Sequence, residues 1–183
     1  MKILAFAASN SKTSINKELA RFTAGLVPGA EVELLDLNDY DLPLYSTDRE
    51  AEIGVPDAAR TFFDKIGAAD AVVVSYAEHN GSYTAAYKNL FDWASRIDQK
   101  VYQDKPALFL STSPGPAGAA SVLAAAKGSA PFFGVDLRGA VSVGSFYDVY
   151  DADTGTITAD EVLADLTAAA EALTTNAVQK DAA

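Results

Sequence analysis

The sequence predicts an α/β protein whose single parallel sheet is covered by helices on both faces. Short apolar runs rich in β-branched residues, such as Ala71-Val72-Val73-Val74, are typical of strands that are buried on both faces. Segments with apolar residues at helical spacing lie between these runs. Strands that alternate with helices imply right-handed crossovers, which make the strands parallel and place helices on both faces.

The first elements follow from where the apolar runs begin and end. A compact apolar run predicts a strand over residues 2–8. A helix is expected over 14–26, because apolar residues recur there at helical spacing until Pro28-Gly29 stops it. Acidic and apolar residues alternate over 31–37, which predicts a strand with one solvated face. Residues 38–55 contain several acids and Pro43, so we expect a loop there.

The middle of the chain continues the alternation. A helix is expected over 56–66, because Pro56 suits the first position of a helix. The β-branched run predicts a central strand over 70–76, and a third helix follows over 85–97. An apolar run then predicts a fourth strand over 106–111.

The last elements complete five strands. We expect an alanine-rich helix over 117–133, a strand over 135–143 and a final amphipathic helix over 159–173. Five strands suit a flavodoxin-like three-layer sandwich with strand order 2-1-3-4-5, whose switch point lies between the first and third strands. We expect residues 1–175 to form this one domain and residues 176–183 to form a disordered tail.

The composition excludes several kinds of site. The 183 residues include no cysteine and one histidine, His79, which excludes disulfides, thiolate metal sites, cysteine nucleophiles and multi-histidine metal sites. A net charge of −11 is poorly suited to nucleic acid. No apolar run approaches the roughly 20 residues that span a membrane. Residues 1–8 run straight into a polar loop, as a first strand does, so we expect no signal peptide and a cytoplasmic protein.

Three polar loops follow the first, third and fourth strands, and loops at the carboxyl ends of parallel strands converge on one crevice. The first loop is rich in hydroxyls and has no acid, which favours an anion at the N-terminus of the following helix. One helix cap needs only one such residue. The loop lacks both the dinucleotide fingerprint and the Gly-Lys-Ser/Thr ending of a triphosphate loop, which leaves a monophosphate cofactor. The hydroxyls are those of Ser9, Ser11, Thr13 and Ser14, while Asn16 adds an amide and Lys12 a positive charge.

The stretch from Ala8 to Asn16 resembles the phosphate loop of NAD(P)H-dependent FMN reductases, flavodoxin-like proteins that include quinone, chromate and azo-dye reductases. The segment Glu78-His79-Asn80-Gly81-Ser82 and the later Lys88-Asn89-Leu90-Phe91-Asp92-Trp93 are similar to two further motifs of that family. The segment 113–118 is similar to its third loop, and the resemblance extends from Lys2 to Leu173.

The resemblance implies FMN as cofactor, with NADPH or NADH as the electron donor. Ser9, Ser14 and Asn16 would bind the FMN phosphate, and Lys12 would supply charge where the family's arginine falls on Ser11. Glu78, His79, Asn80 and Gly81 would border the isoalloxazine. Residues of the third loop, Ser113, Gly115 and Gly118, would close the opposite edge of the ring pocket. The expected cofactor-binding residues are Ser9, Ser11, Lys12, Ser14, Ile15, Asn16, Glu78, His79, Asn80, Gly81, Ser113, Gly115 and Gly118, with no catalytic protein residue and no metal ligand.

In such a protein the cofactor carries the redox chemistry, and the chain supplies orientation and electrostatics. A hydride would pass from the nicotinamide to the flavin, and then on to free flavin, a quinone or a similar small-molecule acceptor. The resemblance also implies a homodimer or homotetramer. Two alternatives remain open: a flavodoxin-type electron carrier, or a cofactor-free binding protein on the same fold. The departures at Ser11, Ala77 and His79 keep the second alternative open.

Several other residues have both a functional and a structural interpretation. His79 is expected to contact the flavin edge, and Glu78 either holds a backbone amide there or caps the next helix. Trp93 fits a core or interface position. Lys88, Asp92 and Arg96 share one helix face, which predicts surface ion pairs. The acids after residue 147 fit a surface turn better than a calcium loop.

Overall fold

The computed structural model describes residues 1–174 and contains a five-stranded parallel sheet in the order β2-β1-β3-β6-β7. This is the predicted 2-1-3-4-5 order of a flavodoxin-like sandwich. The expected tail, residues 176–183, lies outside the described residues. The strands are β1 (Lys2–Ala8), β2 (Glu31–Leu35), β3 (Ala71–Tyr76), β6 (Lys105–Thr112) and β7 (Val135–Val143).

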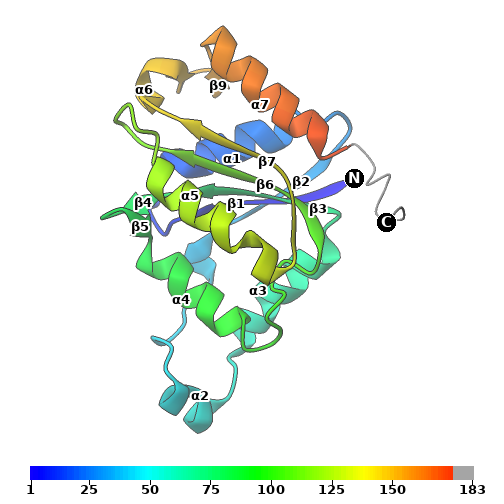
Figure 1. The fold of residues 1–183 in the computed structure, drawn as a ribbon, viewed down its shortest axis with the longest axis vertical. Helices are drawn as coiled ribbons and strands as arrows, with labels where there is room; N and C mark the ends of the chain where they lie inside the picture. The colour runs from blue at the N-terminus through cyan, green and yellow to red at the C-terminus, as the bar shows by residue number, and fades with distance from the viewer. Residues whose placement is uncertain (175–183) are drawn as a thin grey trace.

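Helices cover both faces of this sheet (Figure 1). One face packs against α1 (Ile15–Gly25) and α7 (Asp160–Ala172). The other face packs against α3 (Asp57–Ala68), α4 (Ala85–Ala94) and α5 (Ala120–Ser129). Because successive strand residues point to opposite faces, β1 supplies both apolar clusters, with Ile3 in the first and Leu4 in the second. Apolar residues on both faces explain why the central strands read as unbroken apolar runs.

The predicted loop over 38–55 contains a short helix, α2 (Thr47–Ile53), that the apolar pattern does not reveal. None of its residues is buried, and it protrudes from the body at the lower end of Figure 1. A helix without a buried face has no apolar stripe, and this explains the missed prediction. A 3-10 turn, η1 (Leu37–Asp39), also ends β2 two residues early, because the Asp36 side chain accepts a hydrogen bond from Asn38 N.

The segment before α2 is tied to α4 by side chains of the Lys88–Trp93 motif. Trp93 is fully buried, as expected, and its Nε1 donates to the Pro43 carbonyl at 2.8 Å. Asn89 Nδ2 donates to the same carbonyl at 3.1 Å, and Asn89 Oδ1 accepts from Tyr45 N at 2.8 Å. Surface ion pairs are confirmed on this helix, since Lys88 pairs with Asp92. Arg96, beyond the helix end, pairs with Glu50 of α2.

Several boundaries differ from prediction for local reasons. Pro56 is the N-cap of α3 rather than its first residue, because its backbone is extended. The fourth helix begins at Ala120 instead of residue 117, because Gly118 and Ala119 adopt φ of +61° and +60°. It continues as a 3-10 turn, η2 (Ala130–Phe133), in which Pro131 cannot donate a helical hydrogen bond. The helix α4 ends at Ala94, three residues before the predicted end.

Smaller elements lie at the ends of the strands. A hairpin of β4 (Glu78–His79) and β5 (Ser82–Tyr83) follows β3. After β7 come α6 (Phe146–Val149), β8 (Tyr150–Asp151) and β9 (Thr156–Ile157). The turn between β8 and β9 confirms the surface-turn prediction, because Asp151 Oδ1 accepts from Asp153 N at 2.9 Å.

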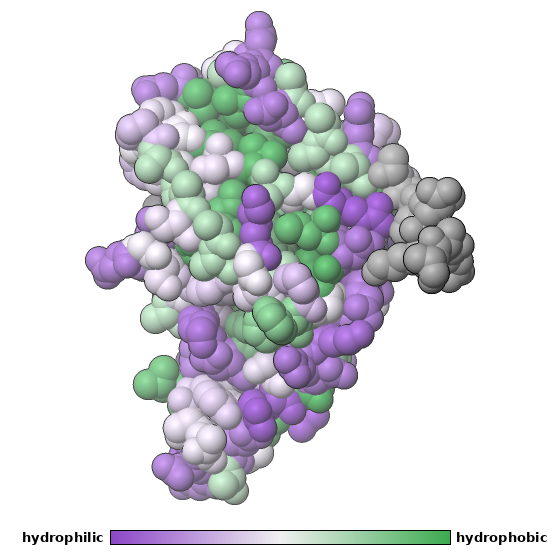
Figure 2. All heavy atoms as spheres, viewed as in Figure 1, coloured by the Kyte–Doolittle hydropathy of each residue, from purple (hydrophilic) through white to green (hydrophobic). Residues whose placement is uncertain are grey.

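The face of the molecule seen in Figure 2 carries both polar and apolar residues. Figure 2 shows hydrophobic residues in separate patches over the sheet-bearing body, while the end that holds α2 is largely hydrophilic or neutral. Among residues 1–174, no helix is long and apolar enough to cross a membrane. Within the same residues, no group of three or more His, Asp or Glu side chains is placed to hold a metal ion.

Candidate functional site

The carboxyl ends of β1, β3 and β6 lie side by side. In the register of the sheet Ala8 pairs with Tyr76, and Tyr76 pairs with Ser111. The loops that leave these strands therefore start from the same edge of the sheet, as the sequence predicts. We name these segments the first loop (residues 9–14), the hairpin (78–83) and the third loop (113–119).

The first loop leads into the N-terminus of α1. Ser14 is the N-cap, and its Oγ accepts from Lys17 N at 3.4 Å. Ser9 is buried and its Oγ accepts from Ser11 N at 3.1 Å, which tightens the turn. Ser11 and Lys12 are exposed, so their side chains are free to meet a ligand from solvent. Ile15 is half-buried and packs against the apolar cluster under α1.

The first two backbone N–H groups of α1 make no hydrogen bond within residues 1–174. A helix leaves its first N–H groups without an intrahelical partner. Those of Ile15 and Asn16 have no other acceptor within the described part of the chain. The helix dipole adds partial positive charge at the same place. Donor groups and a favourable potential make this end of α1 fit a phosphate group.

Asn16 has a different place from the one implied by the family resemblance. Its side chain is buried under the loops, with 3% of its surface exposed. Oδ1 accepts from Ser75 Oγ at 2.7 Å and from Thr112 N at 3.1 Å, while Nδ2 donates to the Thr112 carbonyl at 3.2 Å. These bonds fasten the start of α1 to the ends of β3 and β6. Asn16 is therefore a positioning residue for the first loop.

The hairpin takes its shape from Asn80-Gly81. Both residues have positive φ, 52° and 76°, and they join strands in which His79 pairs with Ser82. Positive φ at both central positions is the mark of a type I′ turn, for which Asn-Gly is strongly preferred. The Asn-Gly pair in the sequence is thus a turn signal at the place where a flavin contact is expected. His79, Asn80 and Gly81 are exposed at the tip of this hairpin.

Both ends of the hairpin are anchored to helices. Glu78 Oε2 accepts from Val122 N at 2.9 Å, so its carboxylate caps the N-terminus of α5. Glu78 thus holds a backbone amide, as one of the two expected roles has it, but this amide belongs to α5 and not to the next helix, α4. Thr84 is the N-cap of α4 and its Oγ1 donates to the Ala8 carbonyl at 2.9 Å. The N-termini of α1, α4 and α5 thus all begin at this edge and contribute positive potential there.

The third loop is packed tightly against the loop after β7. The Gly118 carbonyl accepts from Ser111 Oγ at 2.7 Å and from Ser142 Oγ at 2.9 Å. A Cβ on Gly118 would overlap Ser142 Oγ. Gly115 has open space around it and lies at the exposed surface of the loop, where Ser113 Oγ donates to its carbonyl at 3.1 Å.

Gly144 and Ser145 belong to the same edge, and sequence reasoning missed them. Ser145 N donates to the Gly115 carbonyl at 2.9 Å, and a Cβ on Gly144 would overlap the Pro116 carbonyl. The pair follows a strand directly, as do the other three loops. This shared position is the signal by which a fourth strand-end loop could have been found.

Comparison with known proteins agrees with this geometry. A family model described as NADPH-dependent FMN reductase matches residues 1–148. The chain belongs to the NADPH-dependent FMN reductase family. A flavoenzyme NAD(P)H:(acceptor) oxidoreductase of Paracoccus denitrificans has a similar structure, with a TM-score of 0.75, 30% identity and 94% of each chain covered.

Curated relatives give the same family. The chain is 37% identical over 121 residues to an NAD(P)H-dependent FMN reductase of Pseudomonas aeruginosa, and the aligned region covers 66% of this chain and 64% of the relative. It is 37% identical over 125 residues to an NADPH:quinone oxidoreductase of Arabidopsis thaliana, and here the aligned region covers 66% of this chain and 62% of the relative. The chain thus spans less than two thirds of the length of these relatives.

Proposed function

We propose that this protein is an FMN-dependent NAD(P)H oxidoreductase that reduces free flavin, a quinone or a similar small acceptor. The observation that carries the proposal is the register of β1, β3 and β6, which brings the first loop, the hairpin and the third loop to one edge. Family membership supports the cofactor, and the relatives named as FMN and quinone reductases support the reaction. When bound, FMN would supply the redox chemistry, by accepting a hydride from NAD(P)H and returning two electrons to the acceptor.

The first loop would hold the phosphate of the cofactor. The N–H groups of Ile15 and Asn16 open the N-terminus of α1, and Ser11 and Ser14 belong to the loop that leads into it. Lys12 is exposed on the same loop and adds a positive charge. Ser9 and Asn16 would act from beneath, because their side chains fix the turn and the start of the helix.

The hairpin and the third loop would border the ring. His79, Asn80 and Gly81 are exposed at the hairpin tip, where the backbone can approach an aromatic ring closely. Ser113, Gly115 and Gly118 would close the other side, and Glu78 would hold the hairpin against α5. The chain would provide no nucleophile and no metal. A cytoplasmic location and a homodimer or homotetramer belong to the same proposal.

Absorbance spectroscopy of the purified protein tests the proposal. We expect flavin bands that bleach when NADPH or NADH is added without oxygen, and that return when a quinone is added. Bands that bleach only with dithionite would instead indicate a flavodoxin-type electron carrier. A colourless protein that takes up no added FMN would rule out both flavin functions.

A pair of charge substitutions tests the location of the phosphate. Ser11→Asp places a negative charge beside the N-terminus of α1, and we expect it to weaken FMN binding by about tenfold through repulsion. Ser46→Asp is the matched control, because Ser46 is the exposed N-cap of α2. Equal FMN affinity in the two variants would place the phosphate elsewhere.

A further inference from the structure

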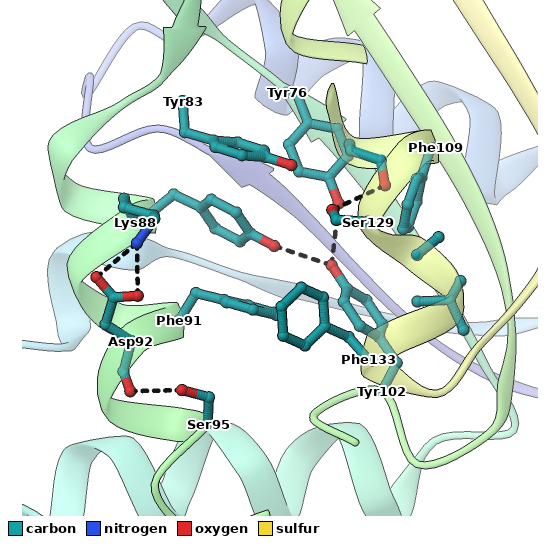
Figure 3. A pocket seen from close by; sticks show the side chains of 14 residues that line it. Tyr76, Tyr83, Lys88, Phe91, Asp92, Ser95, Tyr102, Phe109, Ser129 and Phe133 are labelled. Carbon is teal, nitrogen blue, oxygen red and sulfur yellow. Dashed lines mark hydrogen bonds and ion pairs between the residues drawn. The ribbon is translucent and has the colours of Figure 1, made fainter. Parts of the chain in front are cut away.

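A pocket lined by aromatic rings lies between α4 and α5, apart from the exposed tips of the three loops. Its volume is about 220 Å³. Figure 3 shows Tyr76, Tyr83 and Tyr102 pointing their hydroxyl ends toward its centre, with Phe91, Phe109 and Phe133 around them. Tyr76 ends β3 and Tyr83 ends the hairpin, so the pocket reaches the base of the hairpin.

The volume limits what the pocket can hold. A closed apolar cavity of about 150 Å³ is enough to bind benzene. A volume of about 220 Å³ therefore accommodates one substituted aromatic ring. The surrounding rings meet mainly edge to face, as in the Phe91–Phe133 pair with centroids 4.7 Å apart. Such walls suit a flat ring, which can add further edge-to-face or offset contacts.

Three buried hydroxyls leave one proton without an acceptor. Tyr102 Oη lies 3.0 Å from Tyr76 Oη and 3.1 Å from Tyr87 Oη. Each contact uses one proton, so two contacts account for two of the three protons. No other acceptor for these hydroxyls is present within residues 1–174. All three side chains are at least nine-tenths buried, so the remaining O–H can be satisfied only from inside the pocket.

Burial keeps these hydroxyls protonated. It raises the pKa of Tyr102 to about 12, and it raises the pKa of Tyr76 and Tyr87 well above the usual value. The cluster is therefore neutral at physiological pH and can donate its spare proton to an acceptor.

The charged side chains and the serines at the pocket are already paired. Lys88 Nζ binds both oxygens of Asp92, at 2.6 and 2.8 Å. Ser95 Oγ donates to the Asp92 carbonyl, and Ser129 Oγ donates to carbonyls of its own helix. Since no unpaired charge faces the pocket, a charged ligand would lose its hydration without compensation.

We propose that the pocket between α4 and α5 binds a neutral, single-ring aromatic compound whose carbonyl oxygen accepts the spare proton of the Tyr76–Tyr102–Tyr87 cluster. The ring fills the space between the aromatic walls, and the carbonyl oxygen sits among the three hydroxyls. This site is separate from the proposed flavin site and does not depend on it.

Two probes of nearly equal shape test the polar part of the proposal. Acetophenone carries a carbonyl oxygen where α-methylstyrene carries a CH₂ group. Titration of the purified 183-residue protein, followed by NMR or calorimetry, should show that acetophenone binds about three to ten times more tightly. Equal affinity, or binding of neither probe, would overturn the proposal.

A matched pair of variants tests the location. Ala126 lines the pocket and is buried, while Ala125 on the same helix is exposed. Ala126→Leu fills part of the cavity and should abolish acetophenone binding, whereas Ala125→Leu should leave it unchanged. Thermal unfolding of both variants checks that they are folded. If Ala126→Leu does not fold, the comparison of the two probes on the unmodified protein still tests the proposal. Acetophenone binding that survives in a folded Ala126→Leu protein would place the ligand elsewhere.

The state of the flavin site is a separate measurement. Both probes are titrated with and without added FMN, and the flavin absorbance records how much cofactor is bound. We expect the same preference for acetophenone in both samples. If the preference for acetophenone appears only when FMN is bound, the ligand lies against the flavin and the proposal of a separate site is wrong. If the protein fails to bind FMN, only the proposed function is contradicted.

Discussion

The loops at the carboxyl edge of the sheet and the pocket between α4 and α5 are held by different kinds of contact. The loops depend on a few buried hydrogen bonds, such as those of Asn16 and Glu78, each of which joins segments that are far apart in sequence. The pocket is held by many ring contacts, in which Tyr76 alone meets Tyr83, Tyr87 and Phe109. We therefore expect one substitution to displace the loops, whereas the pocket should keep its structure when a single side-chain group is removed.

The strongest test of this contrast is Asn16→Ala. It leaves Ser75 Oγ and both backbone groups of Thr112 without their partner in a buried place. Each unsatisfied group costs about 1–3 kcal/mol, so we expect a loss of about 3–5 kcal/mol in the free energy of unfolding. Denaturant unfolding measures it, with Asn10→Ala as the exposed control from the first loop. A loss below 1 kcal/mol would show that Asn16 does not fasten the loop.

Gly118→Ala tests the packing of the third loop. The backbone there has a φ of +61°, and the added Cβ would overlap Ser142 Oγ. Left-handed backbone costs an alanine about 1–2 kcal/mol, and the overlap adds to it, so we expect a loss of about 2–4 kcal/mol. Gly115→Ala, which has open space in the same loop, should change stability by less than about 1 kcal/mol. Thermal unfolding measures the stability of both variants. An equal loss of stability in Gly118→Ala and Gly115→Ala would contradict the tight packing around Gly118.

Tyr87→Phe examines the pocket in the same way. It removes one hydroxyl from the cluster but keeps the ring that contacts Tyr76 and Phe91. The expected loss is about 0.5–1.5 kcal/mol, the net contribution of one hydrogen bond. Tyr147→Phe serves as control because that side chain is 69% exposed. A loss as large as that of Asn16→Ala would remove the contrast between the two regions.

The smallest expected effect concerns an ion pair between α1 and the end of β2. Lys17 and two groups of Asn38 hold the pKa of Asp36 at about 2, below its ordinary 3.8. Because the pKa is lower in the folded state, the stabilisation is present above about pH 4 and is lost as the pH falls toward 2. Asp36→Asn should therefore lower stability slightly at pH 7 and flatten the acid limb of the stability curve. Identical profiles of unfolding free energy against pH for the unmodified protein and Asp36→Asn would contradict this role of the ion pair.

The fold was largely predictable because its signals are local. The runs at Ile3–Ala8 and Ala71–Val74 indicate strands buried on both faces, and helical spacing between them indicates the crossovers. The helix α2 was not predictable, since none of its residues is buried and its position depends on Asn89 and Trp93 holding Pro43.

The site was predictable in its location but less so in the roles of its residues. The meeting of the three loops follows from strand order, which the sequence pattern predicts. Which polar side chains face inward depends on distant partners, as with Asn16 on Thr112 and Glu78 on Val122. The tyrosine pocket was missed because its rings come from two strands, the hairpin, α4 and the turns that hold Tyr102 and Phe133, and no local pattern links them.

The central place of β1 has a consequence during synthesis. Residues Ile3 to Ala8 are almost wholly buried, and they pair with β2 on one side and β3 on the other. At about 5–20 residues per second, roughly 3–14 s pass between the translation of Ala8 and that of Tyr76 at the end of β3. Throughout that interval one edge of an apolar strand lacks its partner. An unpaired apolar strand edge is a template for pairing with other chains, so we expect β1 to be most prone to association before β3 has emerged.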